Sequence, residues 1–563
     1  MHLRSKALFE TTRRLLAQVV NEELVLAQLE GEKTNRYLRL LFRGNAGSKA
    51  STTIKVKIKP GTLINQKHGS VTSLLRPENL ELPVTLTERS GSREELNPSA
   101  IFRALSPGFG HNASPGLVDT IAEELQNSAN NQEAWLLMKQ SQPSLSLRSP
   151  MIAWEQSLVL GHPTHPLHRL CRAHHPLRPV TPNDLPDMLF PALGFVSVPV
   201  TDLRISGPFK LTLNPLLTSL GIRSPSDDRV IVPCLAQHLP SALAHFPNAI
   251  HVRTVNDMAS AQASMRTVSL RPELKFPYHM KLSLACQITS ALRTISPNTA
   301  CAAPAITAIL DKTVPPDLWI FREIASATGS QNDYSFAKQL TCILREDLED
   351  RALRNGEALI VTAALMQKVP RTERTYAEVL FDLDTTSDKK NWFRRYVNHL
   401  FRLSLYPLTK HGIALETHPQ NTLVRICTHT GLIRGFAVRD FGGIRFHKPT
   451  LQGQGFPVDW ERQKERFLYE SMDKVVDLVD HALIQNHIGN MLHALNLERS
   501  GGWNIVREEL TKTLKPELGG IRRRIYDYLL KERMLFKCFF KMRFEGIEGW
   551  VSESMDGLDE KPS

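Results

Sequence analysis

The chain has 563 residues, of which 42% are hydrophobic and 22% charged, a balance typical of folded globular proteins that excludes a disordered or fibrous chain. Basic residues outnumber acidic ones by 69 to 57, and the net charge of +12 favours polyanions, membrane surfaces or small acidic substrates without choosing among them. No apolar run approaches the roughly 18 to 20 residues that cross a bilayer, so we expect no transmembrane segment.

The length and the cysteines support two further expectations. A chain of this size predicts three or four units of ordinary domain size, with room for a catalytic cleft between them. The seven cysteines show no CxxC pairing, and their odd number argues against a disulfide framework. We therefore expect reduced cysteines and a cytoplasmic location.

The N-terminal part of the chain is expected to mix helix and strand. Apolar positions at helical spacing, interrupted by acidic residues, predict that residues 1–23 form a surface helix rather than a targeting peptide. Alternating apolar and polar residues predict strands at Tyr37–Phe42 and Ser51–Ile58. The stretch 76–115 is rich in Pro, Ser, Gly and Asn and predicts long loops, after which helical periodicity resumes over 117–137.

The middle of the chain alternates strand and helix predictions. Strands are predicted at Val196–Ile205 and Ala249–Val255, and helices at Cys286–Ile295 and Phe336–Leu353. A polar stretch then precedes the predicted helix Asn391–Leu403, and basic helices close the C-terminal part. These elements predict an α+β fold. The changes in composition divide it into three domains and a disordered tail, at residues 1–150, 151–388, 389–555 and 556–563.

Two short segments of the middle region offer fixed cations beside hydroxyl groups. If the first is extended, Ser264 and Arg266 point to the same side. Lys281 follows on a short strand, and on the predicted helix Thr289 and Arg293 lie four residues apart on one polar face. Such a set suits carboxylate or phosphate, because a planar guanidinium donates two parallel hydrogen bonds. The alternative is a solvated strand and an ordinary amphipathic helix.

A polar turn in the C-terminal region is more specific. We predict a hairpin of Ile413–Leu415 and Leu423–Ile426, followed by a strand that ends at Asp440. Oxygen ligands such as Asn421 and Asp440 suit Mg²⁺, which uses one or two carboxylates together with substrate phosphates. The alternative is a turn whose Pro and Asn serve conformation only. The polar residues grouped at this turn are Glu416, His418, Gln420 and Asn421.

Three other segments carry weaker signals. Gly161–His175 contains histidines at three-residue spacing, but its prolines oppose the helix that would present them to zinc. Loop histidines that face an anion and ordinary loop residues are the two remaining interpretations. Gly108–Gly116 lacks the third glycine of a nucleotide loop and receives no site. The helix predicted around 521–541 mixes basic and aromatic residues as nucleic-acid-binding helices do, but acidic residues interrupt it.

Taken together and in this order, six motifs resemble those of the nonribosomal-peptide-synthetase-independent siderophore synthetases, the family of the aerobactin synthetases. Each motif alone is modest, whereas the ordered set, which spans about residues 150 to 543, is specific. The motifs are Gly161–Pro166, Ser264–Thr267, Lys281–Arg293, His411–Asn421, Arg439–Asp440, and Lys537 with Arg543.

The resemblance implies a three-part cupped hand of thumb, fingers and palm, with ATP in a cleft of the C-terminal palm. It implies an ATP- and Mg²⁺-dependent synthetase that adenylates a carboxylate of citrate or a related acid. An amine or alcohol then attacks the adenylate to give an amide or ester, with AMP and pyrophosphate released. The partners would be these small molecules, with no nucleic acid and no membrane, and homodimers occur in the family.

The resemblance also implies roles for individual residues. Lys281, Arg293 and His418 would be catalytic. ATP would be bound by Ser264, Arg266, Thr267, Lys281, Arg293, His418, Gln420, Asn421 and Asp440. The acid would face His162, His165, Thr289 and Arg293. The metal would be held by Glu416, Asn421 and Asp440.

The chain departs from the family pattern at Arg169, Ala173 and Pro419, where Lys, Gly and Gln are usual. Arg169 keeps the positive charge, so these departures bear on substrate geometry rather than on activity itself. Two alternatives remain open. A kinase-like phosphotransferase is suggested by Asn421 and Asp440-Phe441-Gly442, and a non-catalytic polyanion-binding protein by the basic charge.

Overall fold

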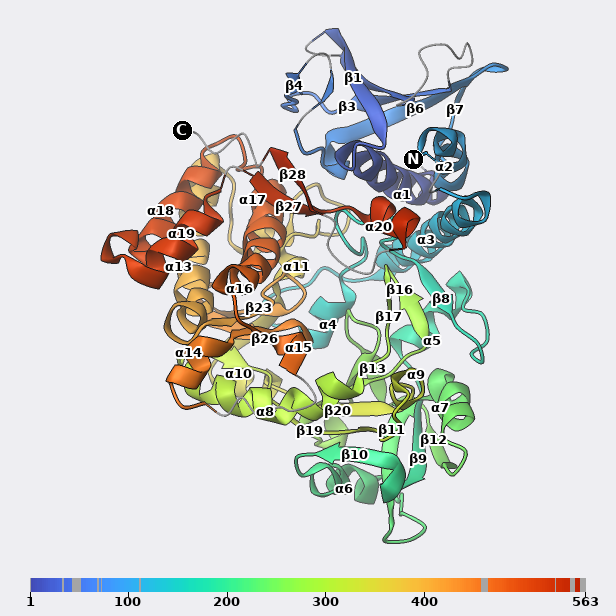
Figure 1. Cartoon of the computed structure of the whole chain (residues 1–563), viewed down its shortest axis with the longest axis vertical. Helices are drawn as coiled ribbons and strands as arrows, with labels where there is room; N and C mark the ends of the chain where they lie inside the picture. Colours follow the sequence, from blue (N-terminus) through green and yellow to red (C-terminus); the bar gives the residue numbers. More distant parts are fainter. Residues whose placement is uncertain are drawn as a thin grey trace.

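The computed structural model describes residues 2–32, 35–42, 52–67, 70–71, 73–110, 113–456, 464–531, 533–546 and 552–556. The predicted disordered tail lies outside these residues except at its first position. Figure 1 shows three regions that follow the chain from the N-terminal sheet, through the middle sheets, to a C-terminal region rich in helices. The mixed content confirms an α+β fold.

The N-terminal region pairs a five-stranded antiparallel sheet with three helices (Figure 1). The predicted strands and the predicted helix 117–137 are confirmed. The long loops predicted for 76–115 are wrong, because two strands and a helix lie there, and the apolar residues of β6 and α2 are turned to the core. The bounds are α1 Leu3–Asn21, β1 Val25–Glu32, β2 Asn35–Phe42, β3 Thr53–Ile58, β4 Gln66–Lys67, β5 Ser70–Val71, β6 Leu80–Glu88, β7 Gly91–Glu94, α2 Pro98–Leu105 and α3 Pro115–Ser141.

Helix α1 is a core element, so the prediction of a surface helix is wrong in that respect. Leu15, Leu16 and Val19 are fully buried between the sheet and α3. Its polar residues are buried as well: Glu10 pairs with Arg14, whose Nε donates a 3.0 Å hydrogen bond to the carbonyl of His162. The helix therefore connects the N-terminal region to a loop of the middle region.

The buried carboxylate of Glu10, which pairs with Arg13 and Arg14, predicts that the free energy of unfolding falls at low pH. Burial raises the pKa of Glu10, but the charges of Arg13 and Arg14 outweigh it and lower that pKa to about 2. A carboxyl group with a lowered pKa stabilises the fold above its unfolded pKa, and the stabilisation is lost as the pH falls through the folded value. We expect Glu10→Gln to cost about 3 kcal/mol at pH 7.

Thermal unfolding of wild type and Glu10→Gln at pH 7 and pH 3 tests this expectation. The difference in melting temperature should shrink at the lower pH. Glu133→Gln is the matched control, because Glu133 pairs with Arg4 at the surface, where ion pairs contribute little. Equal melting temperatures of wild type and Glu10→Gln at pH 7 would contradict the assignment.

The middle region contains a six-stranded antiparallel sheet in the order β10-β19-β20-β15-β14-β13 and two three-stranded sheets, β11-β9-β12 and β17-β16-β8. Strand β12 confirms the prediction at 249–255. The bounds are α4 Met151–Gln156, β8 Cys171–Ala173, α5 Leu185–Leu189, β9 Leu193–Pro199, β10 Leu203–Ser206, α6 Phe209–Ser219, β11 Arg229–Leu235, α7 Leu239–His245, β12 Ile250–Val255, β13 Ala259–Ala261, β14 Thr267–Leu270, β15 Tyr278–Leu282, β16 Cys286–Ile288, β17 Ala291–Leu292, α8 Pro297–Thr313, β18 Leu318–Ile320, β19 Glu323–Gly329, α9 Tyr334–Ala337, β20 Thr341–Glu346 and α10 Glu349–Arg354.

Two helix predictions in this region are wrong. Residues 286–295 form the hairpin β16–β17, which pairs with β8, and α8 begins only after Ser296. Residues 336–353 are divided among α9, the buried strand β20 and α10. Strand β20 is buried on both faces, so its continuous apolar run does not distinguish strand from helix. In the half-buried hairpin β16–β17 the apolar residues happen to fall at helical spacing. The strand predicted at 196–205 is interrupted after Pro199 by a 3₁₀ turn.

The C-terminal region is built around the long helix α13 and a four-stranded sheet, β18-β24-β23-β21. The helix predicted at 391–403 is confirmed, and the polar stretch before it forms its first turn with Thr385 as the N-cap. The bounds are β21 Glu357–Val361, α11 Thr362–Leu365, α12 Tyr376–Leu380, α13 Thr386–His411, β22 Ile413–Ala414, β23 Thr422–Cys427, β24 Ile433–Val438, β25 Arg445–His447, α14 Lys448–Gly453, α15 Lys464–Phe467, β26 Leu468–Tyr469, α16 Met472–Val479, a π-helix Asp480–Ile488, α17 Gly489–Ala494, α18 Gly502–Leu514, α19 Gly520–Leu529, β27 Arg533–Lys537, α20 Phe539–Glu545 and β28 Ser552–Asp556.

The hairpin predicted around the polar turn is wrong. Strand β22 pairs with β25, whereas β23 pairs with β21 and β24, so the polar turn connects two different sheets. The hydrophobic core of this region also takes in residues 302–365, among them Ile306 and Phe321. The chain end returns to the N-terminal region, where the carboxylate of Glu22 accepts hydrogen bonds from the amides of Phe540 and Lys541.

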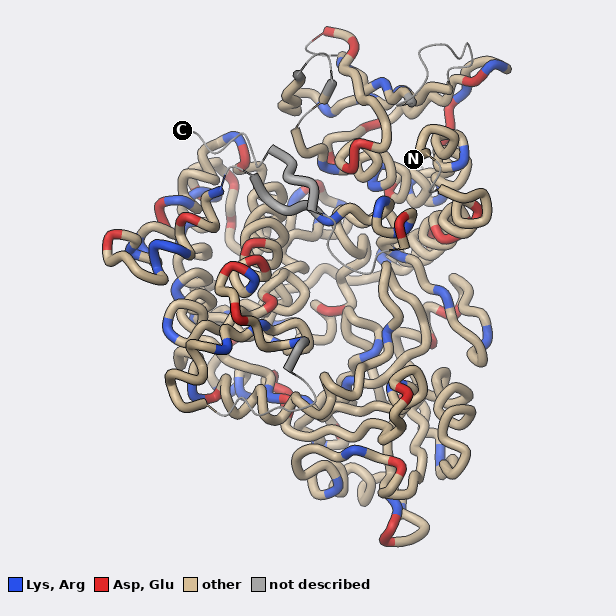
Figure 2. Tube along the Cα trace, viewed as in Figure 1, with Lys and Arg blue, Asp and Glu red and all other residues tan. Residues whose placement is uncertain are grey.

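The positive charge of the chain does not gather on the C-terminal basic helix. Figure 2 shows basic and acidic positions intermixed along these elements. In α19, Arg523 pairs with Asp527 and Arg524 with Asp473. These guanidinium groups are therefore already neutralised by carboxylates.

Candidate active site

A polar cavity of about 410 Å³ lies between the middle and C-terminal regions. Its lining comes from segments that are more than a hundred residues apart in the chain. Ten of the sequence-predicted residues line it: Ser264, Arg266, Thr267, Lys281, Arg293, Glu416, His418, Gln420, Asn421 and Asp440. Of the predicted site residues, His162, His165 and Thr289 do not line it.

A buried lysine connects the two sides of this cavity. Lys281, on β15, places its Nζ 2.6 Å from Oδ1 of Asp440 and 3.6 Å from Oε1 of Glu323. Burial raises the pKa of Asp440, but the charges of Lys281, Arg266 and Arg345 together outweigh it and hold that pKa well below its usual range. Burial raises the pKa of Glu323. Asp440 stands directly after β24 with a positive φ of 62°, which directs its side chain toward the lysine.

Two arginines enter from neighbouring turns. Arg266 is anchored by a 2.8 Å hydrogen bond from its Nη1 to the carbonyl of Thr294. Arg293 follows the hairpin β16–β17, and its buried Nε has no hydrogen-bond partner among the described residues. Burial, together with the charge of Arg266, lowers the pKa of Arg293 to about 10, so it stays cationic at neutral pH. Two close guanidinium groups whose buried Nε atoms both lack a partner among the described residues constitute a site for an anion.

Thr289 lies at the turn of that hairpin with a positive φ of 60°. The prediction that it shares a helical face with Arg293 is wrong, because Thr289 stands at the turn between β16 and β17, whereas Arg293 follows the end of β17. The sequence pattern failed here because Ile288, Leu292 and Ile295 are spaced as in a helix although they belong to extended chain.

The polar turn after β22 is held by its own carbonyl groups. The Oγ1 of Thr362 and the amide of Ala363 both donate to the carbonyl of Pro419, at 2.9 and 3.1 Å. The ring nitrogen Nδ1 of His487, in the π-helix, lies 2.8 Å from the carbonyl of Thr417. These contacts use backbone carbonyl groups of the turn, so the side chains of His418 and Asn421 are left to face the cavity.

Glu416 and Asp440 place two carboxylates at one end of the cavity. A Cβ on Gly443 would meet Oε2 of Glu416 at 2.2 Å, and one on Gly442 would lie 3.5 Å from Oδ1 of Asp440, so the glycines let both side chains approach. Burial and the charge of Asp440 raise the pKa of Glu416 to about 7. Mutually repelling carboxylates beside a buried amide, Asn421, form a donor set that fits Mg²⁺.

The predicted acid-facing histidines lie on a neighbouring loop. His165 packs against Phe539, with ring centroids 4.4 Å apart, and its buried Nε2 has no hydrogen-bond partner among the described residues. His162 is exposed, yet the surrounding protein desolvates its ring and, together with nearby His418, lowers its pKa to about 3. His168 is instead internal, its ring nitrogens 2.7 Å from the carbonyl of Leu160 and 3.1 Å from Oγ1 of Thr11.

Sequence reasoning missed several residues that line the same cavity. Ser296 caps the N-terminus of α8 and receives a 3.1 Å hydrogen bond from Nη1 of Arg466. The pair Ser296-Pro297 is a recognisable helix start, so the signal was present in the sequence. Gln262 and Arg345 carried no such signal, because they stand in strand-rich segments without a motif. The missed lining residues are Gln262, Ala291, Thr294, Ile295, Ser296, Thr299, Arg345, Arg439, Gly442, Gly443 and Arg466.

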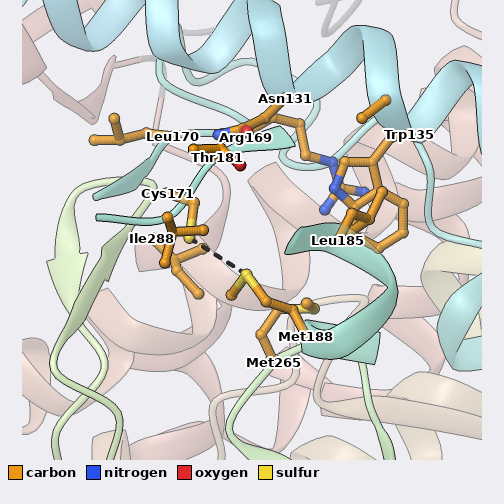
Figure 3. A pocket seen from close by; sticks show the side chains of 12 residues that line it. Asn131, Trp135, Arg169, Leu170, Cys171, Thr181, Leu185, Met188, Met265 and Ile288 are labelled. Atoms are coloured by element: carbon orange, nitrogen blue, oxygen red, sulfur yellow. Dashed lines mark hydrogen bonds between the residues drawn. The ribbon is translucent and has the colours of Figure 1, made fainter. Parts of the chain in front are cut away.

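A second, smaller cavity of about 30 Å³ is lined in part by Arg169 (Figure 3). Arg169 lies over the ring of Trp135 at 3.8 Å, and its Nε donates to the carbonyl of Val159 at 3.1 Å. Apolar side chains and the sulfur contact between Cys171 and Met188 fill the opposite wall. Arg169 therefore packs in the wall of the small cavity beside Trp135 and does not line the polar cavity.

Two negative findings apply to the described residues. No group of three His, Cys, Asp or Glu in that part of the chain is placed to hold a metal ion, so the histidine-rich run does not form a zinc site there. None of the helices described is long and apolar enough to cross a membrane. The seven cysteines are all free thiols, as predicted.

Two family models match the chain. The IucA / IucC family model covers residues 243–367, which hold the cations of the polar cavity. A model described as ferric iron reductase FhuF-like transporter covers residues 390–549. The two matches together span the residues on both sides of the cavity.

Solved structures with the same fold include a petrobactin biosynthesis protein and an aerobactin synthetase. The petrobactin biosynthesis protein AsbB of Bacillus anthracis superposes with a TM-score of 0.80 over 99% of this chain and 96% of its own, at 17% identity. The ATP-bound aerobactin synthetase IucA of Klebsiella pneumoniae gives a TM-score of 0.72 over 98% and 99%, at 16% identity. These likenesses establish the fold.

Curated relatives are closer in sequence. The NRPS-independent siderophore synthetase-like protein ankE of Aspergillus thermomutatus is 42% identical over 549 residues, which is 96% of this chain and 90% of that protein. The NRPS-independent siderophore synthetase rfs of Rhizopus delemar is 31% identical over 66% and 60%. The D-ornithine--citrate ligase of Staphylococcus aureus is 28% identical over 41% and 39%. The chain therefore belongs to the IucA/IucC family of NRPS-independent siderophore synthetases.

Proposed function

We propose that the chain is an ATP-dependent ligase that adenylates a carboxylate of citrate or a related polycarboxylic acid and condenses it with an amine or alcohol. The observation that carries the proposal is the convergence of Arg266, Lys281 and Arg293 with the turn 416–421 around one cavity. The family membership supports it, and one relative is named as a citrate ligase.

The cations are what the first step requires. A carboxylate oxygen must attack the α-phosphate of ATP, and two anions repel each other in the absence of fixed positive charge. Arg266 and Arg293 are held by their own turns and need no rearrangement to bind either anion. The bond between the α- and β-phosphates breaks as the acyl–phosphate bond forms, and pyrophosphate leaves with the electron pair.

The second step transfers the acyl group. A neutral amine or hydroxyl attacks the activated carbonyl, the bond to AMP breaks, and the nucleophile loses a proton. Burial lowers the pKa of His418 to about 4, so this imidazole is neutral near pH 7. Its Nδ1 accepts from the amide of Gln420 at 3.2 Å, and in this proposal that lone pair is released from the amide to take the proton. His162 is neutral for the same reason and is the second candidate base.

We propose that Mg²⁺ is held by the oxygen atoms of Glu416, Asn421 and Asp440, which all line the polar cavity. When bound, it would neutralise phosphate charge. The protein residues position its ligands: the positive φ of Asp440 and the glycines after it set the carboxylate at the cavity wall. In this proposal Lys281 exchanges Asp440 for phosphate when nucleotide binds.

The acid is proposed to lie between Arg293 and the histidine loop, where His162 and His165 stand beside the C-terminal segment. In the same proposal the thumb is residues 1–150, the fingers 151–388 and the palm 389–555, with ATP in the cavity where fingers and palm meet. The protein would act in the cytoplasm on small molecules, without nucleic acid or membrane, as a possible homodimer.

A pyrophosphate-release screen tests this function. Citrate and 2-oxoglutarate are each combined with diamines, hydroxylated lysine derivatives and amino acids, and both AMP and ADP are quantified. We expect AMP and pyrophosphate in equal amounts with at least one pair. ADP without pyrophosphate would favour a phosphotransferase, and no nucleotide turnover in any combination would favour a polyanion-binding protein. The reported relatives support neither alternative.

His418→Ala gives a second test of the same assignment. We expect it to lower turnover on the order of 10²- to 10⁴-fold, because it removes the proposed base and a side chain that faces the ligand. The backbone contacts that hold the turn do not involve the imidazole apart from a local bond to the amide of Gln420. Circular dichroism and the melting temperature should therefore be close to those of wild type. A near-normal rate would remove His418 from the site.

A further inference from the structure

A buried glutamate behind the cavity contacts both of the segments that line it. Glu155 lies on the short helix α4, and its side chain is fully enclosed. Its Oε2 accepts hydrogen bonds from the amide of Ala263 at 3.1 Å and from Nη2 of Arg439 at 2.9 Å. Its Oε1 lies 2.7 Å from Nη1 of the same arginine. One carboxylate therefore joins the 263–267 segment to the end of β24.

Arg439 carries this contact to the polar turn. Its Nη2 and Nε donate to the carbonyl of Gln420 at 2.8 and 3.2 Å, so the arginine holds the turn that bears His418 and Asn421. The amide of Arg439 also donates to the carbonyl of Asn421 at 3.1 Å. The guanidinium is thus bonded to Glu155 on one side and to the turn on the other.

The surrounding charges show why a carboxylate is required at this position. Gln262 accepts from both Arg439 and Arg345, at 3.1 and 2.7 Å through the same oxygen. Two buried guanidinium groups therefore share one neutral acceptor. Removing the charge of Glu155 would leave Arg439 uncompensated in the interior, a situation that proteins avoid. Arg439 itself lines the polar cavity, where nucleotide is proposed to bind.

We propose that Glu155 is a positioning residue for nucleotide binding, which acts through Arg439 on the turn 418–421 and through the amide of Ala263 on Ser264 and Arg266. This inference rests on the proposed function and extends it to a residue outside the cavity lining. It assigns no contact between Glu155 and any substrate. The residue sets where the nucleotide-binding groups stand.

Equilibrium binding of Mg²⁺-ATP by calorimetry tests the inference on the full chain without acid substrate. We expect Glu155→Gln to weaken ATP binding by about tenfold or more, because the amide cannot balance Arg439. The matched control is Glu357→Gln: Glu357 is also buried and pairs with Arg425 at 2.8 and 2.9 Å, but the pair lies outside the cavity lining. Glu357→Gln should lower the melting temperature without changing the affinity for ATP.

A double-mutant cycle separates positioning from general loosening. If Glu155 acts through Arg439, most of the loss caused by Glu155→Gln should disappear when Arg439 is already Gln. Turnover gives a further readout: the KM for ATP should rise while the KM for the carboxylic acid stays within about twofold of wild type, whereas a loosened fold would raise both. Glu155→Asp, which keeps the charge, should bind ATP with intermediate affinity, and it serves if the Gln variant does not fold.

The outcomes are distinct. A wild-type chain that binds no ATP would overturn the proposed function and this inference with it. A wild type that binds ATP, with Glu155→Gln and Glu155→Asp equal to it in affinity, would overturn the inference alone. The inference would also be overturned if the losses of ATP affinity caused by Glu155→Gln and by Arg439→Gln multiplied in the double variant, because the two residues would then act independently.

Discussion

Replacing Arg293 by alanine is expected to lower kcat/KM for pyrophosphate release by about 10³-fold, the usual loss when one preorganised donor to a developing charge is removed. The guanidinium has a buried Nε without a partner and a second cation, Arg266, beside it. Such an arrangement costs free energy in the empty protein because like charges repel and a donor is desolvated. Asp440 offsets part of this cost, and an anionic ligand would offset more of it.

This reasoning also predicts the stability of the variant. If Arg293 serves ligand binding, Arg293→Ala should melt at the same temperature as wild type or higher, since a repulsive contact is lost. Arg293→Lys is the matched control: it keeps the charge but not the planar fork, and should retain part of the activity. Pyrophosphate release and differential scanning fluorimetry on the three proteins give both readouts. A lower melting temperature with normal activity would show that Arg293 is a structural residue.

Replacing Lys281 by methionine is expected to abolish turnover and to destabilise the protein. The ammonium group is the cation closest to Asp440 and Glu323, and its removal leaves the buried Glu323 and the half-buried Asp440 with only the more distant charge of Arg345 and, for Asp440, Arg266. Leaving a buried charge unpaired typically costs about 3 to 5 kcal/mol. The pKa of Asp440 would rise toward its usual range, because Lys281 is the main cause that lowers it.

Thermal unfolding with and without Mg²⁺-ATP measures both consequences. Wild type should gain about 2.7 kcal/mol of stability at 100 times the dissociation constant, whereas Lys281→Met should gain nothing measurable. Glu323→Gln is the control, because it removes a costly buried carboxylate and leaves the Lys281–Asp440 pair in place; it should be at least as stable as wild type. Activity of Lys281→Met within tenfold of wild type would contradict the role given to this lysine.

Local sequence patterns predicted some elements and failed at others for identifiable reasons. Strands β2 and β3 alternate apolar and polar residues because one face of their sheet is buried, and that period of two is visible in the sequence. The hairpin β16–β17 was mistaken for a helix because its strands are too short to show that alternation and Ile288, Leu292 and Ile295 fall at helical spacing. The pairing of β22 with β23 was predicted wrongly because strands adjacent in sequence need not pair. Here β22 pairs with β25 and β23 pairs with β21, in two different sheets.

The chemistry of the site was determined by the sequence itself: the motifs named cations, an imidazole and oxygen ligands, and ten of these residues do line one cavity. Only the tertiary structure decided which charges meet. Lys281 faces Asp440, and Glu155 supports Arg439 from a helix with no motif of its own. Side-chain type is encoded locally, whereas a charge pair across 159 or 284 residues depends on how the sheets and helices pack, and packing is a property of the whole chain.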